Sequence, residues 1–192
     1  MLTVITGPMY SGKTSRLLAM LKANIIAGNP IEVFKPSNDF RYSTTKIATH
    51  DGVDIEAKVL DRDDPVCGFT TRMLKNRNSV LFFDEVQFFN QVGFKLLIRT
   101  LISCGRTVVC AGLANDFLGN PFGAMPYLLS AADEIVSLKA VCSKCRGIGI
   151  ATRTHRTTDD KEQTVVGGTE MYEARCFKCW RFGDDDENEE RV

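Results

Sequence analysis

The chain has 192 residues, enough for one domain with a small second unit, and its 44% hydrophobic content is ordinary for a globular protein. No apolar run reaches the roughly 18 residues that cross a bilayer, and no basic segment precedes an apolar one at the N-terminus, so we expect a cytoplasmic protein, neither secreted nor membrane-inserted. The 24 basic residues balance the 24 acidic ones, six of which fall within residues 184–190. We therefore expect residues 183–192 to form an acidic, disordered tail.

Strand and helix patterns alternate from the start of the chain. Residues 2–6 and 31–34 are predicted strands, because they are rich in β-branched and aromatic residues. Residues 13–27 between them have a helical pattern, which Gly28 closes as a C-terminal cap. A further helix is expected over about residues 65–75, where a proline suits the first helical turn.

The same alternation continues through the middle of the chain. Residues 80–84 and 107–111 are apolar without a period of two, as strands covered on both faces are. A helix over residues 91–102, capped by Asn90, joins them, and residues 134–141 form the last strand of the series. This order predicts an α/β fold with a mostly parallel sheet flanked by helices on both faces.

The segment GPMYSGKT directly follows the first predicted strand and opens the first predicted helix, which is the context that the pattern G-x-x-x-x-G-K-[ST] requires. Glycines let the backbone amides converge on phosphate oxygens, and the helix start adds positive potential. A chance match in a glycine-rich turn is the alternative. The motif predicts a P-loop NTPase-type domain over residues 1–141. The residues of this motif that would bind the phosphates of ATP are Gly7, Pro8, Met9, Tyr10, Ser11, Gly12, Lys13 and Thr14.

Two adjacent acids end the predicted strand 80–84, inside the apolar segment FFDEVQFF. In phosphate-loop enzymes a second strand ends in an acid that holds Mg²⁺, and open α/β sheets bind ligands at the carboxyl ends of their strands. We therefore expect Asp84 to hold Mg²⁺ together with Thr14. Glu85, one residue further on, is placed to act as a general base. The alternative is a pair of solvated acids at a strand end.

Four of the seven cysteines form two C-x-x-C pairs, CSKC and CFKC, near the C-terminus. In an unsecreted chain such pairs favour tetrahedral Zn²⁺ over disulfides, and zinc sites with four cysteine ligands are usually structural. Two redox-active pairs are the alternative. We expect a small zinc-binding domain over residues 142–182, because so short a unit needs a staple. Its ligands would be Cys142, Cys145, Cys176 and Cys179.

Three loops carry candidate ligand-binding residues. LANDFLGNPFG contains Phe117 and Phe122, which either stack on a base or belong to a lid or the core. VVGGTEMY has adjacent glycines that allow close approach to a ligand, and Tyr172 to cover a flat ring, although a simple turn is equally compatible. KPSNDFRYS contains Arg41, whose guanidinium suits phosphate oxygens, although a lone surface arginine is more often solvated.

GPMYSGKT, FKPSNDFRYS to THDG, DEVQFF, PFGA, AVCSKC, VVGG and CFKC occur in the order seen in type II thymidine kinases, and this resemblance covers nearly all of residues 2–180. It implies a phosphate-loop domain and a zinc-stapled "lasso" that closes over the nucleoside. It also implies transfer of the γ-phosphate of ATP, with Mg²⁺, to the 5′-hydroxyl of thymidine, giving dTMP for DNA synthesis. The family's usual state is a homotetramer inhibited by thymidine triphosphate, with no nucleic-acid or membrane partner.

The resemblance also assigns roles residue by residue. Glu85 matches the catalytic base, and Asp84 and Thr14 match the Mg²⁺ ligands. The further residues that it matches to ATP and phosphate binding are Asp39, Phe40, Arg41 and Gln87. The residues that it matches to nucleoside binding are Phe88, Phe117, Phe122, Gln163, Thr164, Val165, Val166, Gly167 and Tyr172. The chain departs from the pattern at Ala114, where many relatives have an acid. It also departs between Cys145 and VVGG, where the segment is slightly longer than usual and contains the unfamiliar RTHRTTDD.

Three other functions are compatible with parts of the sequence. A nucleic-acid-dependent ATPase with a zinc ribbon would carry a long basic stripe interleaved with aromatics, whereas this chain has only the modestly basic KAVCSKCR and RTHR. A nucleotide-binding module without catalysis is opposed by the complete set of Lys13, Thr14, Asp84 and Glu85. A kinase that acts on another nucleoside is the third.

Overall fold

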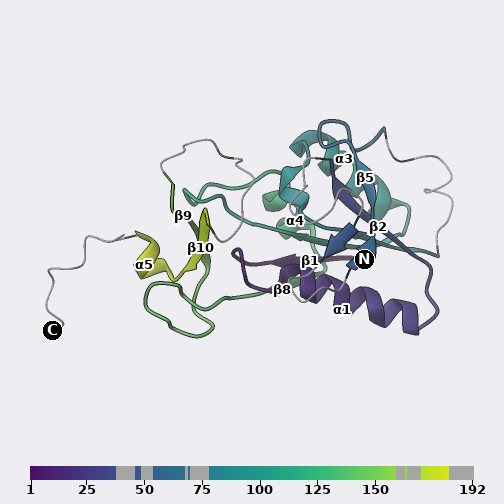
Figure 1. The fold of residues 1–192 in the computed structure, drawn as a ribbon. Helices are drawn as coiled ribbons and strands as arrows, with labels where there is room; N and C mark the ends of the chain where they lie inside the picture. The colour runs from purple at the N-terminus through teal and green to yellow at the C-terminus, as the bar shows by residue number, and fades with distance from the viewer. Residues whose placement is uncertain are drawn as a thin grey trace, which may run out of the picture.

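The computed structural model describes residues 1–37, 46–48, 54–67, 69, 78–158, 163 and 170–181. Its main sheet has six strands in the order β5-β2-β6-β7-β1-β8, and each neighbouring pair is parallel, so the predicted sheet is confirmed (Figure 1). The strands are β1 (Leu2–Thr6), β2 (Ile31–Pro36), β5 (Lys58–Leu60), β6 (Val80–Phe83), β7 (Thr107–Gly112) and β8 (Glu134–Ser137).

Helices cover both faces of this sheet, as the strand–helix order predicts. α1 (Lys13–Ile26) packs on one face, and α3 (Gln91–Ser103) and α4 (Met125–Ala131) pack on the other (Figure 1). The Asn90 side chain caps α3 by accepting a backbone hydrogen bond at 2.9 Å, and Gly28 follows α1 in the left-handed conformation with φ 75°. The short helix α4 was not predicted, because seven residues carry little helical periodicity.

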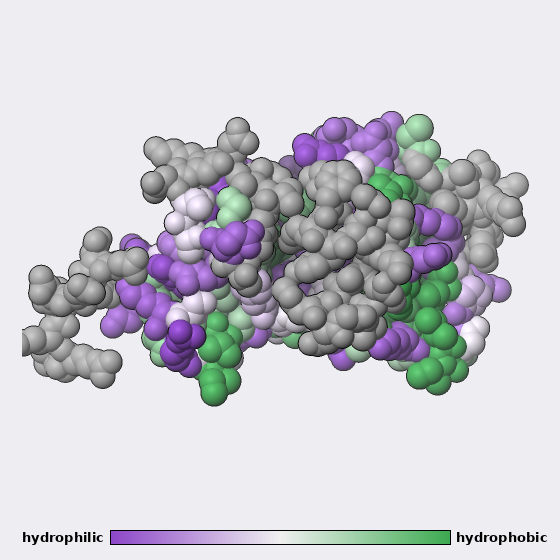
Figure 2. Space-filling view, in the orientation of Figure 1, coloured by the Kyte–Doolittle hydropathy of each residue, from purple (hydrophilic) through white to green (hydrophobic). Residues whose placement is uncertain are grey.

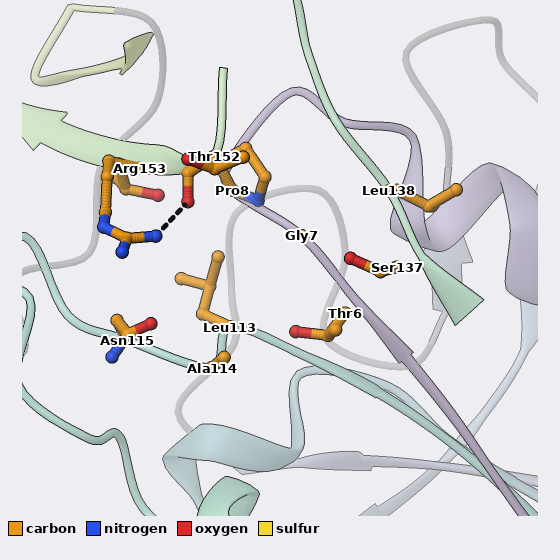
Figure 3. Close-up of a pocket in the computed structure, with 11 residues that line it drawn as sticks. Thr6, Gly7, Pro8, Leu113, Ala114, Asn115, Ser137, Leu138, Thr152 and Arg153 are labelled. Atoms are coloured by element: carbon orange, nitrogen blue, oxygen red, sulfur yellow. Dashed lines mark hydrogen bonds between the residues drawn. The ribbon is translucent and has the colours of Figure 1, made fainter. Parts of the chain in front are cut away.

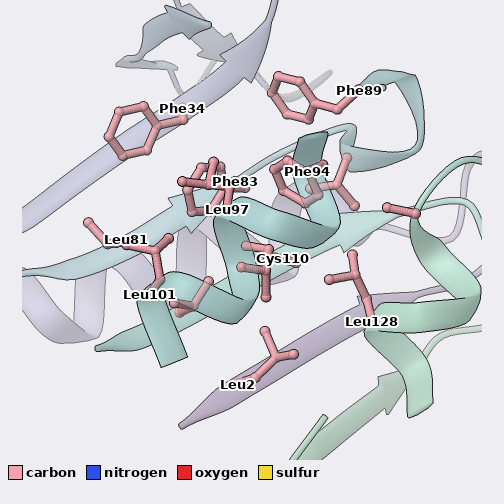
Figure 4. Close-up of a cluster of buried hydrophobic side chains, with 14 of the residues drawn as sticks. Leu2, Phe34, Leu81, Phe83, Phe89, Phe94, Leu97, Leu101, Cys110 and Leu128 are labelled. Carbon is pink, nitrogen blue, oxygen red and sulfur yellow. The ribbon is translucent and has the colours of Figure 1, made fainter. Parts of the chain in front are cut away.

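The strands bury alternate residues in two separate cores. On the α3 face, Phe83 of β6 meets Phe94 edge to face, with ring centroids 5.4 Å apart (Figure 4). On the α1 face, Phe82 packs with Leu17 and its neighbours. Because both faces are covered, β6 is apolar throughout, and Asp84 is the first polar residue beyond it. This explains why acids stand next to phenylalanines in the sequence.

A smaller unit follows the sheet. Its strands β9 (Arg153–Arg156) and β10 (Tyr172–Arg175) pair antiparallel, and the helix α5 (Phe177–Arg181) follows them. Its core consists of only a few small residues around the cysteines, which agrees with the expected need for a staple. A second antiparallel pair in the chain joins β3 (Lys46–Ala48) to β4 (Asp54–Glu56).

Two sequence predictions differ from the structure or lie beyond it. β8 ends at Ser137, four residues earlier than predicted, because the chain leaves the sheet there towards the cysteine unit. The helix expected over about residues 65–75 lies mostly outside the described residues. Of these positions the structure describes residues 65–67, which form a turn, and residue 69. The acidic tail, residues 183–192, also lies outside them.

Figure 2 shows two apolar areas along one edge, and the exposed apolar residues include Ile25 and Ile26 at the end of α1, and Ile148 and Ile150 after the first cysteine pair. Among the residues that the structure describes, no helix has the length and apolar character needed to cross a bilayer.

Candidate functional site

The predicted phosphate loop, residues 7–14, runs from the end of β1 into the first turn of α1. A Cβ at Gly7 would lie 2.6 Å from a backbone oxygen beyond β8, so only glycine fits there. Gly12 has φ 81°, which favours glycine at the helix start. The buried Lys13 donates from Nζ to the Pro8 carbonyl at 2.8 Å, which places its ammonium group over the loop.

The carboxyl end of β6 brings its acids to this loop. Thr14 Oγ1 donates to Asp84 Oδ2 at 3.2 Å, although β7 lies between β1 and β6 in the sheet. Asp84 is buried, and its other carboxylate oxygen accepts from the Glu85 amide at 3.0 Å. Hydroxyl and carboxylate oxygens are the ligands that Mg²⁺ prefers, so these two side chains fit the cation that accompanies ATP.

Glu85 has a left-handed backbone with φ 51°, as do only two other non-glycine residues in the described part of the chain, Tyr10 and Arg146. Such a conformation costs of order 1–3 kcal/mol and concentrates at functional sites. The carboxylate of Glu85 accepts from Gln87 Nε2, and Gln87 Oε1 accepts from the Leu113 amide at 3.0 Å. Gln87 therefore connects Glu85 to the end of β7.

Two glycines leave room for Gln87. A Cβ at Gly112 would lie 2.7 Å from Gln87 Oε1, and one at Gly123 would collide with the Gln87 carbonyl. The Gln87 side chain is buried and both ends of its amide are hydrogen-bonded, so it has little freedom and holds the orientation of Glu85.

Aromatic residues from three segments of the chain form two groups. Phe88 and Phe122 meet edge to face at 5.7 Å, and Phe122 is buried. The half-buried Phe117 lies under the Arg156 guanidinium, and the buried Tyr172 accepts a hydrogen bond from the same group at 2.7 Å. Phe117 and Tyr172 are therefore linked through Arg156.

Three further residues at the site were missed by the sequence reasoning. Thr154 Oγ1 accepts from the Met9 amide at 3.0 Å, which ties β9 to the phosphate loop. Asp116 accepts from Gln163 Nε2 at 2.8 Å, and Arg156 contacts the aromatics. Thr154 and Arg156 stand two apart on β9 and are both buried, but RTHR has no alternation of apolar and polar residues, so its sequence did not indicate them.

A cavity of about 220 Å³ lies beside the start of the phosphate loop (Figure 3). It opens between the carboxyl ends of the sheet strands and the start of β9, and Asp84 and Glu85 are not among its lining residues. That lining consists of Thr6, Gly7, Pro8, Leu113, Ala114, Asn115, Ser137, Leu138, Thr152, Arg153 and Thr154.

The four predicted metal ligands come together. The sulfurs of Cys142, Cys145, Cys176 and Cys179 all lie within 4.8 Å of one another, and those of Cys145 and Cys176 are 3.9 Å apart. Zn–S bonds of about 2.3 Å in a tetrahedron put sulfurs about 3.8 Å apart, so the cluster fits Zn²⁺.

The thiol chemistry of this cluster also suits a cation. Burial opposes ionisation of Cys142, but backbone hydrogen bonds from Cys176 and Cys145 outweigh it and lower the pKa of Cys142 to about 6. Burial and the neighbouring thiols raise the pKa of Cys179 to about 12. A dication among the four sulfurs would favour the thiolate form of all of them.

Several predicted site residues lie outside the described residues. These are Asp39, Phe40 and Arg41 on the phosphate side, and Thr164, Val165, Val166 and Gly167 on the nucleoside side. Gln163 is described, and its side chain contacts Asp116.

Comparisons with known proteins agree with one another. The model of a family described as "Thymidine kinase" matches residues 1–180. Curated relatives named thymidine kinase include one from Bacteroides thetaiotaomicron, 38% identical over 92% of this chain and 85% of the relative. Another, from Mycoplasma mobile, is 38% identical over 95% of this chain and 88% of the relative. A third, from Pseudothermotoga lettingae, is 38% identical over 93% of this chain and 94% of the relative.

Proposed function

The chain belongs to the thymidine kinase family, and from that premise we propose how its own residues transfer the γ-phosphate of ATP to the 5′-hydroxyl of thymidine. The observation that carries the proposal is the hydrogen bond between Thr14 and Asp84, because it joins the phosphate loop to the acids that end β6. Donor phosphates and general base then lie at one place, the carboxyl edge of the sheet.

The phosphate loop binds the donor. Backbone amides of residues 7–14 and the positive end of α1 hold the phosphate oxygens, and Lys13 turns its ammonium from the Pro8 carbonyl to the β- and γ-phosphates. Thr14 and Asp84 would hold Mg²⁺, which offsets charge on these phosphates when it is bound. Arg41, together with Asp39 and Phe40, would also bind the phosphate groups of ATP.

Glu85 is the proposed general base. It accepts the proton of the 5′-hydroxyl while that oxygen forms a bond to the γ-phosphorus, and the bond to the β–γ bridging oxygen breaks to release ADP. The left-handed backbone and the hydrogen bond from Gln87 support this role, because they hold the carboxylate in one orientation.

The nucleoside lies on the aromatic side of the site in this proposal. Phe117 and Tyr172 flank the thymine, with Phe88 and Phe122 behind it. The backbone of residues 163–167 pairs with the amide edge of the base, which rejects bases that would leave those groups unpaired. Closure of this segment excludes water and limits ATP hydrolysis.

The resemblance supports four further proposals, and the run of acids near the C-terminus supports residues 183–192 as a separate acidic tail. Residues 142–182 form a lasso domain that Zn²⁺ ties together. The protein assembles as a homotetramer, works in the cytoplasm and is inhibited by thymidine triphosphate, which would occupy both the phosphate and the nucleoside side.

Replacement of Gln87 tests how Glu85 is oriented. Gln87→Met keeps the volume of the side chain but removes the hydrogen bonds to Glu85 and Leu113, so we expect kcat to fall about tenfold with little change in either KM. Steady-state kinetics measures this, with Gln91→Met on the exposed surface of α3 as the matched control. An unchanged kcat would show that Glu85 does not depend on Gln87.

The proposed function is tested with purified protein, ATP and Mg²⁺, and a panel of nucleosides, with monophosphate formation as the readout. Thymidine should be phosphorylated faster than cytidine, uridine or purine nucleosides. A preference for another nucleoside would redirect the proposal to a sister kinase. ATP hydrolysis that depends on DNA, with no monophosphate formed, would favour the zinc-ribbon ATPase.

A further inference from the structure

Arg156 is buried and contacts two aromatic side chains, and neither the sequence nor the catalytic steps account for it. Its guanidinium carbon is 3.8 Å from the centroid of the Phe117 ring and 5.2 Å from that of Tyr172. It also donates to the Tyr172 hydroxyl from Nη2 at 2.7 Å and from Nε at 3.2 Å. One cation thus contacts a ring from the loop after β7 and a ring on β10.

The loop that carries Phe117 is tied to the cysteine unit at two other points. The Phe117 carbonyl accepts from the Trp180 indole at 3.0 Å. Asp116 accepts from Gln163 Nε2 at 2.8 Å and from the backbone amides of Leu118 and Asn120 within the loop. These contacts hold the loop itself, whereas the Arg156 guanidinium contacts both the Phe117 and the Tyr172 ring.

The chemistry of a guanidinium suits this position. It is planar, it stacks on aromatic faces, and its N–H groups form a rigid fork, whereas a lysine ammonium is a flexible point charge. We propose that Arg156 is a positioning residue that sets the spacing between the Phe117 and Tyr172 rings and so determines the affinity for the nucleoside. This inference rests on the proposed function, in which the thymine contacts both rings.

The substitution Arg156→Lys tests the proposal, because it keeps the charge and removes the stacking plane and the fork. We expect the KM for thymidine to rise about tenfold or more, while the KM for ATP, the bound zinc and the melting temperature stay close to those of the wild type. Arg99→Lys, at an exposed position of α3, is the matched control and should change none of these values.

A second readout does not depend on turnover. Trp180 is the only tryptophan of the chain, and its indole bonds to the Phe117 carbonyl. We expect Arg156→Lys to shift the Trp180 emission to longer wavelength, because the loop would dock less tightly. Tyr172→Phe removes only the hydroxyl acceptor and should raise the KM for thymidine. Its effect should add little to that of Arg156→Lys, because both substitutions disrupt the contact between the guanidinium and the Tyr172 hydroxyl.

Two results would overturn the inference. The first is an Arg156→Lys variant that retains both the wild-type KM for thymidine and the wild-type Trp180 emission. The second is a parallel loss of zinc, stability and affinity for both substrates, which would assign Arg156 to folding alone. A failure of the proposed function is seen separately, since the wild-type chain itself would then phosphorylate no thymidine.

Discussion

Glu85→Gln should lower the turnover of thymidine by about a hundredfold or more, with the affinities for ATP and thymidine close to those of the wild type. The amide has the shape of the carboxylate but cannot take the proton of the attacking hydroxyl. Its carbonyl oxygen can still accept from Gln87 Nε2, so the side chain should keep its place. Steady-state kcat and calorimetric binding of each substrate measure the two parts of this prediction.

The matched control for Glu85 is Glu56→Gln, which removes one carboxylate from an exposed position on β4 and should leave kcat unchanged. If Glu85→Gln turned over thymidine at near the wild-type rate, the assignment of the general base would be wrong. The base would then have to be sought among the other groups near the end of β6.

Loss of one cysteine ligand should also have a large effect, on zinc binding and on the KM for thymidine. Cys176→Ser should release the metal, since a serine hydroxyl replaces a thiolate poorly in a tetrahedral zinc site. Because Cys176 follows β10 directly, the strand that carries Tyr172 should loosen. We expect the KM for thymidine to rise about tenfold or more and the melting temperature to fall, with a smaller change in the KM for ATP.

Zinc content by mass spectrometry and the two KM values check this prediction. Cys67→Ser changes an exposed cysteine outside the cluster and should retain both the zinc and the activity. A Cys176→Ser protein with full zinc content and an unchanged KM for thymidine would show that the four cysteines do not hold the nucleoside-binding residues in place through bound zinc.

Most of the α/β domain was predictable from local sequence patterns. The apolar run of β6 reflects burial on both faces, and the phosphate-loop motif identifies the turn between β1 and α1. Asn90 and Gly28 mark helix ends through local hydrogen bonding and backbone freedom. These elements depend on interactions between residues close in sequence, so the sequence carries their signals.

The site was predictable only in part, because its remaining contacts join residues far apart in the chain. Asp116 meets Gln163 across 47 positions, and no pattern around either residue indicates that pair. The left-handed backbone of Glu85 is unusual for a glutamate, so the residue type did not predict this conformation. Arg156 appeared in the sequence only as one of several basic residues, although it is buried against aromatic rings.

The structure of the protein with thymidine and a non-hydrolysable ATP analogue tests the central claim most directly. We predict that the triphosphate lies in the loop of residues 7–14, and that a carboxylate oxygen of Glu85 lies about 2.6–3.2 Å from the 5′-oxygen. A triphosphate bound away from that loop, or a Glu85 side chain turned away from the nucleoside, would contradict the account.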